Sequence, residues 1–432
     1  MKKVFRSICV CGMTFLAVSL GNGQEVSEEV RVVAPAEQEV SRPFFLDMVV
    51  PLKFYAVPGH EFNIYFEGLI CSPSNQFPVV LLQAGQGSHR EIRYTWTPKR
   101  EDVAKEYPFK IELRNALDEV LEVVSVPVHL AKPDAGAGQK IRLLCIGDSL
   151  TNASQYTAEL LHLFGEKKEG GEEEKEKTET PGTGSTETTA ATITGTEEKN
   201  PELILLGTNV PRSSIPENRH EGYGGWKFSD FNTRYELERV NPEKYNLRNS
   251  PFIFEVGGKV DFTRYFETYT ENQKPDFVTI FLGHNDVANV TDQNREEAIE
   301  KIMVQAREFV SALRAALPEA RIAVITPALP ARQDAFGENY GTRINHWTYR
   351  KNCHLLSQKL IQEFSESPLK VSIIPAHLVV DAANGYPEQE RPANARSSKK
   401  VFQQTNALHP NTEGYKQIAD AIYAWMKVEL SK

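Results

Sequence analysis

Residues 141–150 read Ile-Arg-Leu-Leu-Cys-Ile-Gly-Asp-Ser-Leu, an apolar run that stops at Gly147-Asp148 and continues into Ser149. A helical pattern, Gln155–Phe164, follows within a few residues. A short buried strand that leads directly into a helix is typical of a parallel sheet covered by helices. Ser149 then lies at the carboxyl edge of the sheet, where ligands bind in such folds. The alternative is that Ser149 or Thr151 only caps the helix.

Further apolar runs and helical patterns repeat this arrangement to the end of the chain. The runs are short and rich in branched residues: Leu203–Leu206, Phe277–Leu282, Ile322–Ile325 and Val371–Ile374. The helical patterns are Arg295–Leu317, Ile344–Phe364 and Thr412–Val428. Strands that are buried on both faces show no alternation of apolar and polar residues. The sequence therefore predicts a three-layer α/β domain over residues 139–432.

Residues 25–132 have a different pattern, with short β segments separated by turn residues. The segments are Val30–Val33, Phe44–Val50, Phe62–Phe66, Val79–Gln83, Glu91–Trp96, Phe109–Leu113 and Val120–Leu130. Several short strands at this spacing predict a small all-β sandwich. Tyr94–Pro98 and Tyr107–Ile111 resemble bacterial immunoglobulin-like modules. Residues 133–138, which contain Pro and Gly, are expected to link the two domains.

Residues 1–23 have the pattern of a signal peptide, with a basic start, an apolar run at Ile8–Leu20 and small residues after it. We therefore expect a bacterial protein that is secreted, periplasmic or held at the cell surface. Residues 165–200 consist mainly of Glu, Lys, Thr and Gly, which predicts a low-complexity insertion in the α/β domain. The formal net charge of -9 disfavours nucleic acid as a partner. No apolar run after the leader is long enough to span a membrane.

The candidate chemistry depends on a serine and a distant histidine. His409 lies in Asn406-Ala-Leu-His-Pro-Asn411, directly before the last helical pattern, and can reach the sheet edge at which Ser149 is expected. A serine hydroxyl needs a base in order to attack at neutral pH. Cysteines do not offer another chemistry, because only Cys71, Cys145 and Cys353 follow the leader and none belongs to a metal-binding pattern.

Four segments, in this order, resemble the sequence blocks of the SGNH (GDSL-type) hydrolases. They are Gly147-Asp-Ser-Leu150, Gly222-Tyr-Gly-Gly-Trp226, Gly283-His-Asn-Asp286 and Leu408-His-Pro410. The resemblance implies a flavodoxin-like α/β/α fold and a serine esterase with Ser149 as nucleophile and His409 as base. It also implies an oxyanion hole made by the backbone N–H groups of Ser149 and Gly225 and the side-chain amide of Asn285. No metal or other cofactor is implied.

The chain departs from the family pattern at Asn406, where the family usually has an aspartate that orients the histidine. An amide can hold the imidazole tautomer but cannot stabilise its positive charge as a carboxylate does. Three interpretations follow: a Ser-His dyad aided by Asn406 or a backbone carbonyl, a carboxylate recruited from elsewhere such as Asp381, or a chain that has lost activity.

The resemblance implies the removal of an acyl group. Acetyl on a carbohydrate is the expected substrate because of the leader, the accessory β segments and the similarity to bacterial polysaccharide-degrading esterases. Trp226, which follows the oxyanion glycine, is the candidate wall of the substrate pocket. A lipase or thioesterase that acts on longer acyl chains is the alternative within the same class. From a different class, a catalytically impaired glycan-binding protein is the other candidate.

Overall fold

The computed structural model describes residues 47–72, 80–83, 85–103, 105, 107–115, 117–165, 200–209, 215–237 and 248–432. All of them belong to the compact unit Pro43–Lys432. The expected signal peptide lies outside the described residues, as does the expected insertion at 165–200 apart from its two end residues.

The centre of the unit is a six-stranded sheet in the order β10-β8-β11-β12-β13, with β9 also paired to β8. The strands of this sheet pair in parallel. The strands are β8 (Lys140–Gly147), β9 (Glu202–Leu206), β10 (Glu221–Gly222), β11 (Phe277–Phe281), β12 (Arg321–Ile325) and β13 (Val371–Ile374). Five of the six coincide with the apolar runs, so the prediction of a parallel sheet is confirmed.

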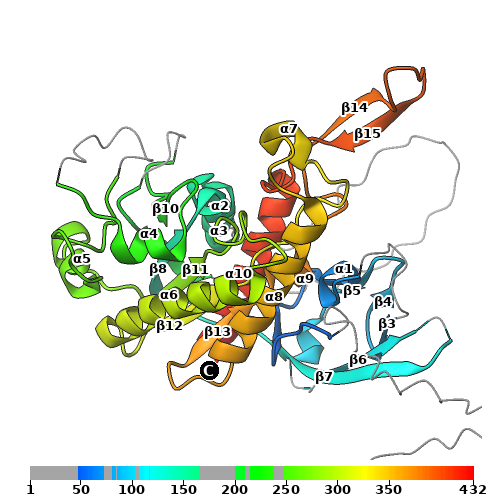
Figure 1. The fold of residues 1–432 in the computed structure, drawn as a ribbon. Coiled ribbons are helices and arrows are strands. Elements are labelled where there is room, and N and C mark those ends of the chain that lie inside the picture. The colour runs from blue at the N-terminus through cyan, green and yellow to red at the C-terminus, as the bar shows by residue number, and fades with distance from the viewer. Residues whose placement is uncertain are drawn as a thin grey trace, which may run out of the picture. The chain divides into compact units, whose positions relative to one another are not determined.

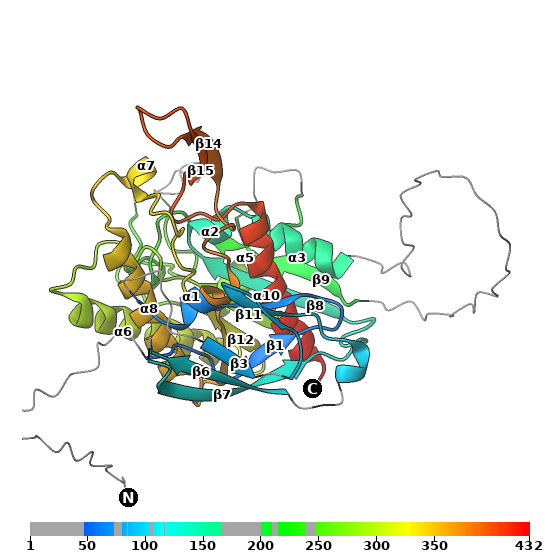
Figure 2. The same cartoon turned by 90° about the vertical axis from the view of Figure 1, so that its right-hand side faces the viewer.

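Helices cover both faces of this sheet (Figures 1 and 2). The helices of one face include α4 (Phe228–Thr233), α5 (Phe262–Tyr269), α6 (Arg295–Ala316) and α8 (His346–Phe364). Those of the other include α3 (Gln155–Gly165) and α10 (Thr412–Leu430). Along β8, Leu144 and Ile146 pack into the first layer, whereas Leu143 and Cys145 pack into the second. Because both faces are buried, β8 is apolar at nearly every position.

The N-terminal part contains two antiparallel-rich sheets with a common core. One has the order β1-β7-β6-β3 and the other β2-β5-β4. The strands are β1 (Phe54–Ala56), β2 (Phe62–Tyr65), β3 (Val80–Gln83), β4 (Ser88–His89), β5 (Arg93–Trp96), β6 (Tyr107–Arg114) and β7 (Val120–Leu130). Leu378, from the short helix α9 (Ala376–Val379), belongs to the same hydrophobic cluster, so this core continues into the α/β part. The immunoglobulin-like resemblance and the domain boundaries remain predictions.

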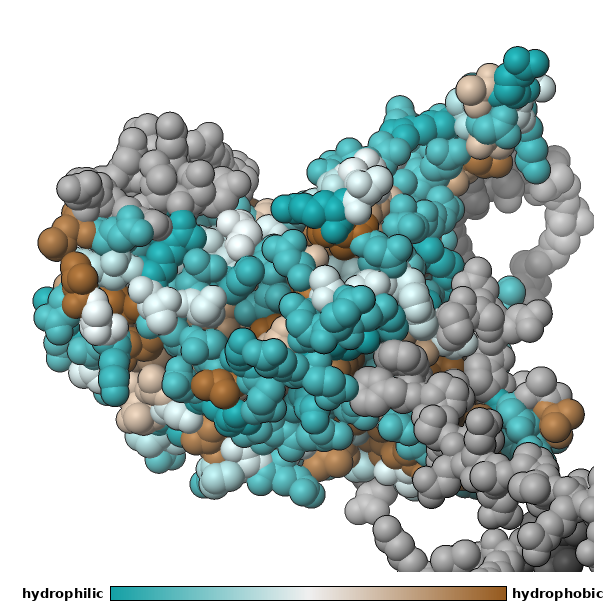
Figure 3. Space-filling model, in the orientation of Figure 1, coloured by the Kyte–Doolittle hydropathy of each residue, from teal (hydrophilic) through white to brown (hydrophobic). Residues whose placement is uncertain are grey.

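A hairpin that the sequence did not predict projects beside α7 (Phe336–Tyr340) (Figure 1). Its strands are β14 (Glu388–Pro392) and β15 (Lys400–Gln404), and β15 leads directly into the loop that carries His409. The face seen in Figure 3 is mainly hydrophilic, with scattered hydrophobic residues. None of the helices in the described ranges is long and apolar enough to cross a membrane.

Candidate active site

Ser149 is placed by the sharp turn between β8 and α2 (Ser149–Asn152). Asp148 is the N-cap of α2, and its Oδ1 accepts a hydrogen bond from the backbone N–H of Leu150 at 3.0 Å. The turn needs glycine at position 147, because a Cβ there would lie 2.0 Å from Thr151 Oγ1 and 2.8 Å from the backbone oxygen of Phe281. The strand end, the cap and the close packing together fix the start of α2, and with it the serine.

His409 reaches Ser149 from the loop that precedes α10. The distance between His409 Nε2 and Ser149 Oγ is 2.9 Å, which is a hydrogen bond. Burial lowers the pKa of His409, while the charge of Asp148 acts in the opposite direction and His284 adds to the lowering. A lowered pKa keeps the imidazole neutral at neutral pH, as a general base requires. The structure therefore brings together the two residues on which the predicted chemistry depends.

Gly225 lies in a turn at the same sheet edge. The backbone N–H of Trp226 donates to the backbone oxygen of Tyr223 at 3.2 Å, and Gly225 has φ +81° inside that turn. A positive φ at the third residue of a turn favours glycine. The backbone N–H of Tyr223 donates to the backbone oxygen of Gly147 at 3.0 Å, which ties this turn to the serine turn.

The amide of Asn285 connects a third segment to the same place. Its Nδ2 donates to the backbone oxygen of Trp226 at 3.1 Å. An amide nitrogen carries two hydrogens, so this bond orients the group and leaves a second donor. Ser149, Gly225 and Asn285 thus come from three segments that hydrogen bonds hold at one edge, an arrangement that suits donors to an oxyanion.

A buried Asp-His pair lies beneath the nucleophile, and the sequence did not predict it. His284 Nδ1 lies 3.1 Å from Asp148 Oδ2, and both side chains are buried. The backbone N–H of Ala328 donates to His284 Nε2 at 3.0 Å, so Nε2 is an acceptor and the ring proton is on Nδ1. Nδ1–H therefore donates to Asp148. The Gly-x-Asn-Asp block leaves position 284 unspecified, and no other pattern in the sequence indicates this pair.

Asn406 does not contact the imidazole in the way that was predicted. Its Oδ1 accepts hydrogen bonds from the backbone N–H groups of Leu408 at 3.0 Å and His409 at 2.9 Å. The amide therefore shapes the histidine loop. Among the described residues, only Nε2 of the His409 ring takes part in a hydrogen bond.

Asp381 is also not the recruited carboxylate. Its Oδ1 accepts from the backbone N–H groups of Ala383 and Asn384, and its Oδ2 accepts from Asn384 Nδ2 at 2.8 Å. These bonds close its own turn. The structure leaves Asp148 as the carboxylate next to the Ser149-His409 pair.

Trp226 is not a pocket wall, which corrects the prediction. Its side chain is 1% exposed and packs on Tyr223 at 4.4 Å and on Phe231 at 4.9 Å between ring centroids. The large apolar ring belongs to the core of one helical layer. Trp226 contributes to the site through its backbone oxygen, which holds Asn285.

A second Ser-His contact in the molecule has the wrong tautomer for base catalysis. His220 Nε2 lies 2.7 Å from Ser154 Oγ, but His220 Nδ1 accepts from the backbone N–H of Gly222 at 3.1 Å. The ring proton is therefore on Nε2, which donates to Ser154 and cannot remove its proton. Burial lowers the pKa of His220 to about 4 and keeps the ring neutral. This pair supports β10 and the turn that follows it.

Asp286 joins the third block to the start of α4. Its Oδ1 accepts from the backbone N–H of Phe228 at 3.2 Å, whereas its Oδ2 is buried and has no hydrogen-bond partner among the described residues. Burial raises the pKa of Asp286 to about 7, and the charge of Asp148 adds to that effect. A neutral carboxyl group avoids the cost of burying an unpaired charge.

Residues 213–417 match the model of the GDSL-like Lipase/Acylhydrolase family. No curated protein was found to match the chain. Similar solved structures include a family 3 carbohydrate esterase of Clostridium thermocellum, with 14% identity over 66% of this chain and 94% of that chain and a TM-score of 0.32. Another is a carbohydrate esterase family 3 from Talaromyces cellulolyticus, with 18% identity, 65% and 94% coverage and a TM-score of 0.29. A lipase/acylhydrolase from Enterococcus faecalis has 13% identity, 66% and 95% coverage and a TM-score of 0.30.

The family match includes Gly225, Asn285 and His409, whereas Ser149 precedes it and is assigned from its geometry. The family match and the parallel α/β sheet support a place for this chain among the GDSL-like lipase/acylhydrolases.

Proposed function

We propose that this chain is a secreted serine esterase that removes acyl groups, in the simplest case acetyl, from carbohydrate. The observation that carries the proposal is the 2.9 Å contact between Ser149 Oγ and His409 Nε2 at the carboxyl edge of the parallel sheet. Secretion is part of the proposal and rests on the leader pattern of residues 1–23.

In the proposed reaction, His409 Nε2 takes the hydroxyl proton while Ser149 Oγ attacks the ester carbonyl carbon. The carbonyl oxygen becomes an oxyanion that accepts hydrogen bonds from the Ser149 and Gly225 N–H groups and from Asn285 Nδ2. His409 then gives its proton to the leaving alcohol, which leaves an acyl-serine. Water attacks the acyl-serine with His409 again as base, and the acid is released.

The positive charge on His409 is stabilised by the buried carboxylate of Asp148 in this mechanism. Asp148 is adjacent to the nucleophile in the chain and fully buried, and its charge raises the pKa of His409. A charge acts strongly through a medium from which water is excluded. Asp148 thus takes over the electrostatic part of the role that an acid at position 406 has in the family, while His284 acts in the opposite direction.

A polar cavity lies along the segment that follows Asn285, and its lining favours a carbohydrate substrate, although Ser149, Asn285 and His409 do not line it. The cavity has a volume of about 300 Å³, and its lining includes Asn289, Gln293, Asn345 and Thr348. Its wall also includes Tyr349, whose hydroxyl donates to the backbone oxygen of His284 at 3.2 Å. Amide and hydroxyl groups suit the hydroxyls of a sugar better than a long alkyl chain.

The test compares p-nitrophenyl acetate hydrolysis by the wild type, Ser149→Ala and Ser154→Ala. Ser154 is the matched control, because it also contacts a histidine. We expect Ser149→Ala to lose about 10³-fold or more of kcat/KM, while Ser154→Ala keeps most of it. Equal rates for the wild type and Ser149→Ala would remove the catalytic assignment.

Substrate class is tested with acetate release from a panel of acetylated polysaccharides and with p-nitrophenyl palmitate. Faster turnover of the acetylated polysaccharides supports the carbohydrate substrate. Faster turnover of palmitate favours the lipase alternative. If the protein binds glycan but shows no Ser149-dependent hydrolysis, a catalytically impaired binding protein is favoured.

A further inference from the structure

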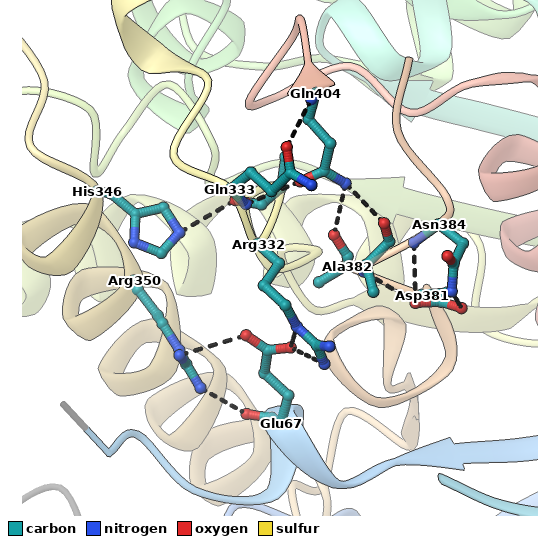
Figure 4. Close-up of polar contacts among 11 residues, drawn as sticks. Glu67, Arg332, Gln333, His346, Arg350, Asp381, Ala382, Asn384 and Gln404 are labelled. Atoms are coloured by element: carbon teal, nitrogen blue, oxygen red, sulfur yellow. Dashed lines mark hydrogen bonds and ion pairs between the residues drawn. The ribbon is translucent and has the colours of Figure 1, made fainter. Parts of the chain in front are cut away.

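Glu67 is a buried carboxylate in the N-terminal part of the chain, and its partners lie in the α/β part. Glu67 belongs to α1 (Phe66–Leu69), and its side chain is 6% exposed. Its Oε2 accepts from Arg332 Nε at 2.8 Å and from Arg332 Nη2 at 2.7 Å. Arg350 completes the cluster, with Nη1 at 3.3 Å from Glu67 Oε1 and Nη2 donating to the backbone oxygen of Glu67 at 3.1 Å (Figure 4).

The two arginines belong to elements near the histidine loop. Arg350 is on α8, and Arg332 is in the loop that follows β12. Arg332 holds the carboxylate with two donors, a geometry that fixes the guanidinium plane as well as its position. The backbone of Arg332 is held in turn, because its N–H donates to the backbone oxygen of Ala382 at 2.9 Å.

The Arg332 segment is bonded directly to the segment that carries His409. The backbone N–H of Ala331 donates to the backbone oxygen of Ala407 at 2.9 Å, two residues before the histidine. Gln333 and Gln404 exchange hydrogen bonds, since each backbone N–H donates to the other side-chain oxygen, at 2.8 and 2.9 Å. Figure 4 shows Gln404 above Arg332, with Glu67 on the opposite side of that arginine.

A second connection joins the N-terminal part to the same region. Gln417 on α10 donates through Nε2 to the hydroxyl of Tyr65 at 3.1 Å and accepts from the backbone N–H of Asp381 at 2.8 Å. Residue 68 must be glycine here, because a Cβ would lie 1.9 Å from the backbone oxygen of His377 on α9. The backbone of α1 thus packs directly on the α/β part.

We infer that Glu67 is a positioning residue for His409, acting through Arg332 and the Ala331–Ala407 backbone hydrogen bond. The N-terminal part of the chain is then an integral support of the active site and not a separable binding module. This inference rests on the proposed function for its kinetic readout. A reacting group that is misplaced by about 1 Å can lose roughly 100-fold in rate, so a loop anchor has measurable consequences.

The experiment compares Glu67→Gln with Glu112→Gln. Glu112 is the matched control, because it is also a buried carboxylate of the N-terminal part, and its partners Lys110 and Arg114 lie in the same strand at 2.5 and 2.9 Å. Both variants remove one buried charge, but only Glu67 is connected to the His409 loop. We expect Glu67→Gln to lower kcat by roughly 10- to 100-fold, with little change in KM, and Glu112→Gln to keep the kcat of the wild type.

The pH profile separates positioning from a general loss of folded protein. The groups that face His409 are Asp148, which raises its pKa, and His284, which lowers it, while burial has the largest effect and lowers it. If the loop loosens, water reaches the imidazole and its pKa rises toward the ordinary value. The acid limb of kcat/KM should therefore move to higher pH in Glu67→Gln. NMR titration of the His409 ring should show the same shift without any substrate.

Arg332→Gln provides a second variant that keeps the Glu67–Arg350 pair and breaks only the contact between Glu67 and the segment that is bonded to the His409 loop. We expect it to reproduce the fall in kcat and the shifted acid limb. Unchanged kcat and an unchanged His409 titration in folded Glu67→Gln or Arg332→Gln would overturn the inference. If the wild type shows no Ser149-dependent hydrolysis, the proposed function is refuted instead. The NMR titration of His409 would still test the positioning role of Glu67.

Discussion

Asp286→Asn should change how the stability of this protein depends on pH. Burial raises the pKa of Asp286 from 3.8 to about 7. Between these values the folded chain holds a proton that the unfolded chain has lost. The free energy of unfolding must then fall as pH rises through this window, because the folded state binds more protons. At about 1.4 kcal/mol for each pKa unit, the contribution of Asp286 amounts to roughly 4 kcal/mol.

The assay is urea unfolding of the wild type and Asp286→Asn at several pH values between about 4 and about 7.5. Asparagine retains an oxygen for the Phe228 N–H but does not titrate. The stability of the variant relative to the wild type should therefore improve by roughly 4 kcal/mol from the acid to the neutral end. Asp261→Asn is the control, because that carboxylate caps α5 in an exposed position.

A constant difference between the wild type and Asp286→Asn across the window would refute the reasoning. It would mean that the folded and unfolded chains bind the Asp286 proton equally well. The buried Oδ2 would then need a compensating cation or donor, which the described residues do not supply.

Four substitutions at three further positions test the site. Asp148→Asn removes the anion that raises the pKa of His409, so the acid limb of kcat/KM should move to lower pH. The value of kcat should fall by at least about tenfold, which corresponds to ~1.4 kcal/mol in the activation barrier. An unchanged pH-rate profile would contradict the electrostatic role of Asp148. Asn406→Ala leaves two backbone N–H groups without their acceptor, which should lower the free energy of unfolding by about 1–3 kcal/mol and reduce kcat. Asn406→Asp retains both hydrogen bonds and should move the acid limb of kcat/KM to higher pH. Gly222→Ala places a Cβ 2.5 Å from the backbone nitrogen of Asn152 and should lower stability by about 1–3 kcal/mol, measured by urea unfolding; wild-type stability would show that the serine turn can move aside.

The sheet could be predicted from the sequence because its strands are buried on both faces. The segment Val371–Ile374 has the same bounds as the strand β13, and Ile141–Ile146 lies inside β8. In a continuous apolar run the side chains on both faces of the strand are apolar, so the sequence itself indicates that both faces are buried. The helical pattern Thr412–Val428 likewise predicted the bounds of the last helix, Thr412–Leu430, to within two residues.

The hairpin Glu388–Gln404 could not be found in this way. Its first strand reads Glu-Gln-Glu-Arg-Pro, and its residues are mostly exposed. A strand that packs on no core has no reason to alternate apolar with polar residues, so periodicity carries no signal. The two-residue strand Glu221–Gly222 is too short to show any period, although it leads into the turn that contains Gly225.

Side-chain roles in the site depend on partners that are distant in the chain, and here the sequence was least informative. The Ser154-His220 contact is shorter than the Ser149-His409 contact, at 2.7 Å against 2.9 Å, yet the backbone N–H of Gly222 keeps the His220 proton on the wrong nitrogen. In the same way, Asn406 resembles a substituted catalytic acid in sequence but serves two backbone N–H groups in space. The negative charge near His409 comes instead from Asp148. In the sequence, the presence of Asp148 is already explained by its role as the N-cap of the next helix. In the proposed mechanism, the buried carboxylate of Asp148 beside the nucleophile therefore supplies the charge that an acid at position 406 would supply.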